Sequence, residues 1–143
     1  MATSLQTRWA IALAGLAVWA AVVPWLARAV GLELDVATRL EIVDHVVPAV
    51  VMLAGAAMLA TRAGAPGGRV WLGAGGIAFL TGLWITATHL PLIPDAFDSL
   101  APWGVALLHL STGPPILVCG LWMVLRTRPS DVQSSGERGA HRS

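Results

Sequence analysis

Residues 103–128 read WGVALLHLSTGPPILVCGLWMVLRTR, a long apolar stretch that ends in Arg-Thr-Arg. Up to the first of these arginines it contains no Asp, Glu, Lys or Arg. At about 1.5 Å of rise per residue, a helix of this length crosses the roughly 30 Å hydrocarbon core of a bilayer. His109 lies inside the apolar run, and Pro114 and Pro115 follow it. The stretch therefore predicts a membrane-spanning helix that carries a histidine and, beyond it, a proline kink.

The whole chain shares this apolar character. Its 143 residues have a mean hydropathy of +0.71, and only 12% are charged, against about a quarter in soluble domains. Hydrophobic residues make up 56% of the chain, in runs that suit outer faces in contact with lipid. The lipid bilayer is therefore the first expected partner. The net charge of +1 comes without a basic patch, so we expect no nucleic-acid binding.

Three further apolar runs precede the stretch, and charged or Gly/Pro-rich segments separate them. We expect membrane spans near residues 9–29, 38–61, 70–90 and 102–126. Because spans joined by short loops pack as neighbours, the sequence predicts an all-α integral membrane protein, a four-transmembrane-helix up-down-up-down bundle. Residues 127–143 are polar and lack aromatic side chains, which predicts a disordered tail.

The first apolar run has a second interpretation, a cleaved signal peptide. Ala27, Arg28 and Ala29 resemble an A-x-A cleavage site, and Pro24 stands before them as a helix breaker. Against this interpretation, the run is long for a signal peptide and only one arginine precedes it. We therefore expect the first helix to be retained.

Arginine placement predicts the orientation, because arginine-rich segments stay on the cytoplasmic side. One side of the predicted bundle holds most of the arginines: Arg8, Arg62, Arg69, Arg126, Arg128, Arg138 and Arg142. The other side holds Arg28 and Arg39 together with acidic loops. The prediction is a multi-pass protein of the cell membrane with both termini in the cytoplasm.

Two histidines are expected at the same depth in this bundle. His45 precedes Arg62 by 17 residues, and His109 precedes Arg126 by the same number. Both arginines mark the cytoplasmic boundary, so both histidines lie about 25 Å above it, in the outer half of the membrane. The second and fourth helices of an up-down bundle are diagonal, and their inward side chains can meet across the core.

This geometry suggests a cofactor, either haem b or a transition metal, bound by His45 and His109. Asp44, His89 and Thr112 would then surround and orient the ligands, with His89 in a more peripheral position near the membrane boundary. The alternative is that the histidines only form hydrogen bonds between helices. A further hypothesis pairs Asp44 with His45 as a proton-handling couple. The chain lacks the converging polar residues of an enzyme, so we do not expect catalysis.

A stripe of small residues on the third span favours close helix packing. It consists of Ala74, Ala78, Gly82 and Thr86. Such a stripe can also receive another chain, in a homo-oligomer or a larger membrane complex. The first functional expectation is therefore a non-catalytic structural or accessory membrane subunit that uses this stripe as its partner surface. The alternative is a haem- or metal-binding membrane protein of the electron-transfer type.

The predicted orientation can be tested with reporter fusions. A reporter fused after Arg69 should be active only as a cytoplasmic protein, and one fused after Asp98 only as an exported protein, because the arginine-rich segments stay inside. Activity of both fusions on the same side would contradict four spans.

Overall fold

The computed structural model describes residues 4–31, 40, 42–62, 68–98 and 103–126. In this part of the chain all regular structure is helical, which confirms the predicted fold class at that level. Four segments are long and apolar enough to cross a membrane: Leu5–Ala29, Ile42–Thr61, Arg69–Phe97 and Trp103–Leu125. The predicted tail at 127–143 and the predicted beginning of the second span at 38 lie outside the described residues.

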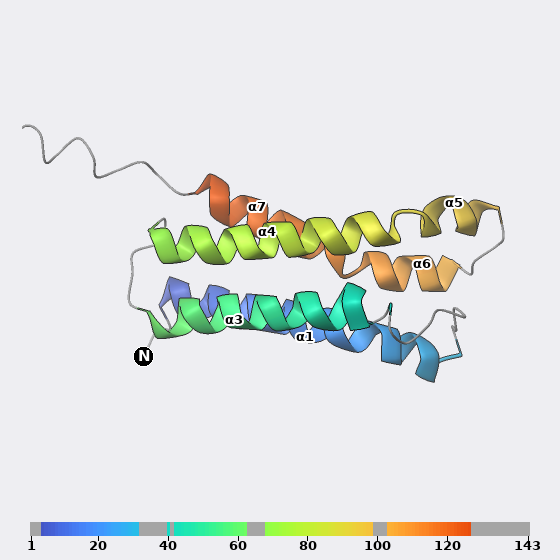
Figure 1. Ribbon diagram of the computed structural model, residues 1–143, viewed down its shortest axis with the longest axis horizontal. Coiled ribbons are helices and arrows are strands. Elements are labelled where there is room, and N and C mark those ends of the chain that lie inside the picture. The colour runs from blue at the N-terminus through green and yellow to red at the C-terminus, as the bar shows by residue number, and fades with distance from the viewer. Residues whose placement is uncertain (1–3, 32–39, 41, 63–67, 99–102, 127–143) are drawn as a thin grey trace, which may run out of the picture.

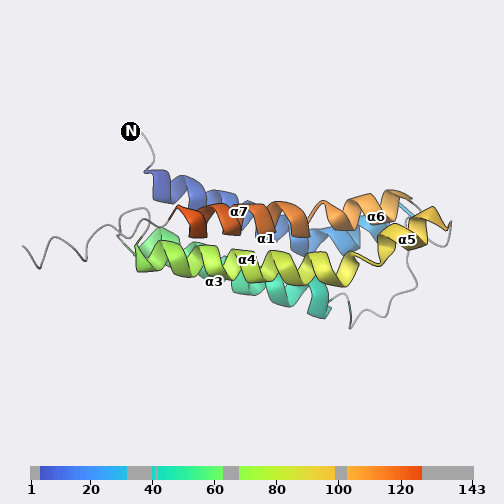
Figure 2. The ribbon, with the colours of Figure 1, turned by 90° about the horizontal axis from the view of Figure 1, so that it is seen from above.

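The long helices lie side by side along one axis (Figures 1 and 2). The elements in chain order are α1 (Leu5–Ala29), the π-helix η1 (Ile42–Val46), α3 (Val47–Thr61), α4 (Arg69–His89), α5 (Leu92–Phe97), α6 (Trp103–Leu110) and α7 (Gly113–Leu125). Helix α3 packs against both α1 and α4, and the closest packing in the bundle joins α4 to α7. Helix α6 contacts α1 and α4. The short helix α5 forms the end of the third segment, Arg69–Phe97.

Helix α1 begins at Leu5, before the predicted start at residue 9, because Ser4 caps it. The Ser4 hydroxyl accepts a hydrogen bond from the amide of Thr7 at 3.2 Å, which satisfies one of the unpaired N–H groups of the first turn. The side-chain amide of Gln6 donates to the carbonyls of Leu59 and Arg62, both at 2.6 Å. The beginning of α1 therefore lies beside the end of α3.

Three tryptophans close the same end of the bundle. The ring of Trp9 stacks on that of Trp122 at 4.5 Å between centroids, and Trp71 meets Trp9 edge-on at 6.0 Å. The indole N–H of Trp71 donates to the carbonyl of Met123 at 2.9 Å, and the Arg126 guanidinium lies 4.7 Å from the Trp122 ring. This tryptophan cluster (Trp9, Trp71 and Trp122) joins the beginnings of α1 and α4 to the end of α7.

The predicted proline kink takes the form of a break between two helices. Helix α6 ends at Leu110 and α7 begins at Gly113, so the Pro-Pro pair occupies the first turn of α7, where proline is tolerated. The hydroxyl of Thr112 donates to the carbonyl of His109 at 2.6 Å, and the hydroxyl of Ser111 donates to that of Leu108 at 2.6 Å. Side chains thus supply hydrogen bonds at the break, which lipid cannot supply.

The small-residue stripe of α4 is covered within this chain. Ala74, Ala78 and Gly82 are buried, and the neighbouring helix is α7. A Cβ atom added at Gly82 would overlap the backbone of Leu117, and one added at Gly120 would overlap the backbone of Phe79. These glycines let the two backbones approach closely. In the described residues, the stripe therefore packs against α7 of the same chain.

Alanine substitutions of glycines in α4 and α7 test whether the two helices pack this closely. At a packed glycine the added methyl should destabilise the protein, whereas at an open glycine alanine should only favour the helix. Gly82→Ala and Gly120→Ala should each lower the free energy of unfolding by about 1 to 3 kcal/mol, because the added methyl forces α4 and α7 apart. Thermal unfolding in detergent, followed by circular dichroism, measures the effect.

Gly76→Ala on the same helix is the matched control, since a Cβ there would meet nothing within 4 Å. It should leave stability unchanged or raise it slightly, because alanine favours helix over glycine. Equal destabilisation by all three substitutions would contradict the close approach of α4 and α7.

Candidate metal centre

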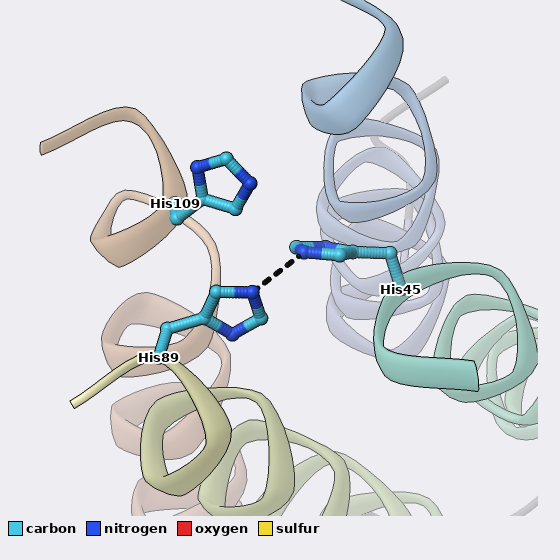
Figure 3. A group of neighbouring side chains, drawn as sticks. All are labelled: His45, His89 and His109. Carbon is cyan, nitrogen blue, oxygen red and sulfur yellow. Dashed lines mark hydrogen bonds between the residues drawn. The ribbon is translucent and has the colours of Figure 1, made fainter. Parts of the chain in front are cut away.

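Three buried histidines lie close to one another in the bundle (Figure 3). His45 comes from η1, His89 is the last residue of α4, and His109 belongs to α6. The ring centroids are 4.6 Å apart for His45 and His89, 5.0 Å for His89 and His109, and 5.4 Å for His45 and His109. The side chains are 0%, 9% and 3% exposed in chain order. We call this group the histidine cluster.

The backbone around His45 departs from α-helical geometry. Residues Ile42–Val46 form a π-helix, and Pro48 follows it in the first turn of α3. Proline has no amide hydrogen, so it cannot give the carbonyl of Asp44 the hydrogen bond expected in an α-helix. Single π-helical turns often occur at functional sites because they redirect a side chain. Here the turn contains the one η1 residue that is buried, His45.

Each ring of the histidine cluster is fixed by a hydrogen bond from Nδ1 to a backbone carbonyl. The acceptors are Ala20 for His45 (3.1 Å), Ile85 for His89 (2.8 Å) and Val105 for His109 (3.0 Å). A carbonyl oxygen can only accept, so the Nδ1 atom of all three rings carries the proton. In a neutral imidazole the other nitrogen, Nε2, then carries the lone pair. The fold thus selects one tautomer at three positions.

The ring nitrogens of the three histidines lie close together. One ring nitrogen from each histidine lies within 4.8 Å of its counterparts on the other two, and the Nε2 atoms of His45 and His89 are 3.0 Å apart. This contact is a hydrogen bond (Figure 3), which requires a proton on one of the two Nε2 atoms. A metal ion between the two nitrogens would take the place of that proton, because two bare lone pairs at this distance repel each other. Converging neutral imidazole nitrogens are ligands that zinc, copper, iron and nickel accept. Among the residues that the structure describes, no carboxylate or thiol joins this group.

The structure brings His45 and His109 together, as the depth argument expects, and it adds His89 on equal terms. The sequence does contain a signal for His89, because this residue continues the α4 stripe past Thr86 towards the fourth span. Asp44 is half-buried and stands outside the ligating group. Thr112 is fully buried and holds the carbonyl of His109 rather than its ring.

Comparison of the chain with protein-family models, with curated proteins and with solved structures gives no match. The function must therefore be inferred from the geometry of the histidine cluster.

Proposed function

We propose that this chain is a membrane protein that binds one transition-metal ion through His45, His89 and His109. The observation that carries the proposal is the shared tautomer: three Nδ1–H groups bond to backbone carbonyls, and three rings then face one another. Metal-binding histidines usually donate their other ring N–H to a carbonyl or carboxylate, which fixes the ring and strengthens the ligand. All three histidines show this arrangement.

The spacing within the cluster suits a single ion. Metal–imidazole bonds of about 2.0–2.1 Å place neighbouring nitrogens of a tetrahedral site about 3.3 Å apart. The 3.0 Å between the Nε2 atoms of His45 and His89 is within a few tenths of an ångström of that value. The three nitrogens lie within 4.8 Å of one another, so the ring of His109 would have to approach the other two more closely to share the ion.

The same spacing argues against haem b. An iron between two axial histidines needs their nitrogens on opposite sides, about 4 Å apart for bonds near 2.0 Å, with a macrocycle between the rings. His89 lies 4.6 Å from His45 and 5.0 Å from His109, between ring centroids. His89 thus occupies the space beside His45 and His109 that a haem macrocycle would need. The geometry therefore favours a bare ion.

We further propose that the four spans cross the cell membrane up-down-up-down with both termini in the cytoplasm. The arginine distribution supports this orientation, since Arg8, Arg62, Arg69 and Arg126 stand at the ends of spans on one side. Hydrogen bonds of Gln6 to Leu59 and Arg62 support it as well, because they join the beginning of the first span to the end of the second. The histidine cluster then lies in the outer half of the bilayer.

The interpretation as a purely structural or accessory subunit rested on the small-residue stripe of α4. Because α7 covers the stripe, that observation no longer favours a partner chain. The Nδ1 atoms of His89 and His109 bond to carbonyls of their own helices, so these two bonds do not join helices. What favours metal binding is that one nitrogen from each of the three rings lies within 4.8 Å of the other two.

Alanine substitution of each ligand tests the site. Protein purified in detergent after expression with copper, zinc and iron supplied should contain about one ion per chain. His45→Ala, His89→Ala and His109→Ala should each lose nearly all of it, and double substitutions should be no worse than single ones, because ligands of one ion act as a unit. Metal analysis by mass spectrometry measures the content. His89 should matter as much as the other two.

His141→Ala is the matched control, because it removes an imidazole that follows the last span in the sequence. It should leave the metal content unchanged. If the histidines serve only to hold helices together, each substitution should cost on the order of 1 kcal/mol of stability independently, and the wild type should contain no metal. That pair of results would refute the proposal.

A further inference from the structure

We infer that the ion held by the histidine cluster is monovalent copper. This inference rests on the proposed metal site and concerns which ion that site selects. Its grounds are the charge of the ligand set, the number of ligands, and the burial of the cluster.

The ligand set carries no negative charge. Its three members are imidazoles in the tautomer that donates from Nδ1, and no carboxylate or thiol of the described residues joins them. The electrostatic cost of burying an ion rises with the square of its charge, so a divalent ion left uncompensated costs about four times as much as a monovalent one. Asp44, half-buried beside His45 in the chain, can balance one positive charge but not two. The balance of charge therefore favours a monovalent ion.

The number of ligands points to the same ion. Structural zinc sites have four protein ligands, and catalytic zinc sites have three plus an open position for water. The cluster offers three ligands from the described residues, and its least buried member is only 9% exposed. Divalent copper prefers a tetragonal arrangement with further ligands. Monovalent copper, with a filled d shell, is stable with three nitrogens around it.

The cluster is also held in that arrangement from several sides. The carbonyls that fix its rings belong to α1, α4 and α6, and His45 itself comes from η1. Divalent copper prefers further ligands, which the three imidazoles do not supply. The bound ion should therefore resist oxidation by air.

A competition experiment tests the choice of ion. The full chain is purified in detergent, stripped with a chelator, and dialysed without oxygen against equal concentrations of buffered monovalent copper and zinc. Copper should be retained at about one ion per chain, in excess over zinc. The X-ray absorption edge should be that of monovalent copper bound by three nitrogens, before and after exposure to air. His89→Ala should abolish retention, and His141→Ala should not.

The outcomes separate the two proposals. Preferential retention of zinc, equal retention of both ions, or copper found in the divalent state would overturn the inference about monovalent copper and leave the metal site standing. Retention of neither ion by the wild type, while its helical content is preserved, would overturn both. Retention that survives His45→Ala, His89→Ala and His109→Ala would place the copper elsewhere and overturn both as well.

Discussion

Three hydrogen bonds from imidazole Nδ1 to backbone carbonyls fix the orientation of the buried histidine rings. Inside a membrane a polar group must find its partner within the protein, because lipid supplies none. By using Nδ1 to meet that requirement, His45, His89 and His109 present Nε2 to one another. One ring nitrogen from each of the three histidines then lies within 4.8 Å of the other two. The proposed metal ion would lie among these nitrogens and replace the proton that now joins His45 to His89.

The rest of the chain keeps those rings in place. Glycines at 82 and 120 let α4 and α7 pack backbone to backbone, and the tryptophan cluster ties the opposite end of the bundle. The break at Ser111 and Thr112 separates α6 from α7, and the hydroxyl of Thr112 holds the carbonyl of His109. The close packing of α4 against α7 positions these helices. The irregular backbone near the histidines orients their side chains toward one another.

Much of the fold follows from hydropathy, because lipid imposes a minimum length and an apolar surface on every span. The depth match of His45 and His109 also follows from sequence, since a helix has a fixed rise per residue. The equal role of His89 does not, because it lies 20 residues from Arg69 rather than 17, and a straight helix would place it nearer the surface. The π-helical turn at His45 and the helix break after His109 adjust the backbone locally. Pro114 and Pro115 indicate the break, but no periodicity in the sequence shows the π-helical turn.

The central claim is that the three Nε2 atoms share one metal ion. Anomalous X-ray scattering from crystals of the copper-loaded protein, collected at the copper edge, tests it most directly. The account predicts one peak per chain, about 2.0–2.1 Å from the Nε2 atoms of His45, His89 and His109. A peak at any other position, or rings that turn their Nε2 atoms away from a common point with no peak between them, would contradict it.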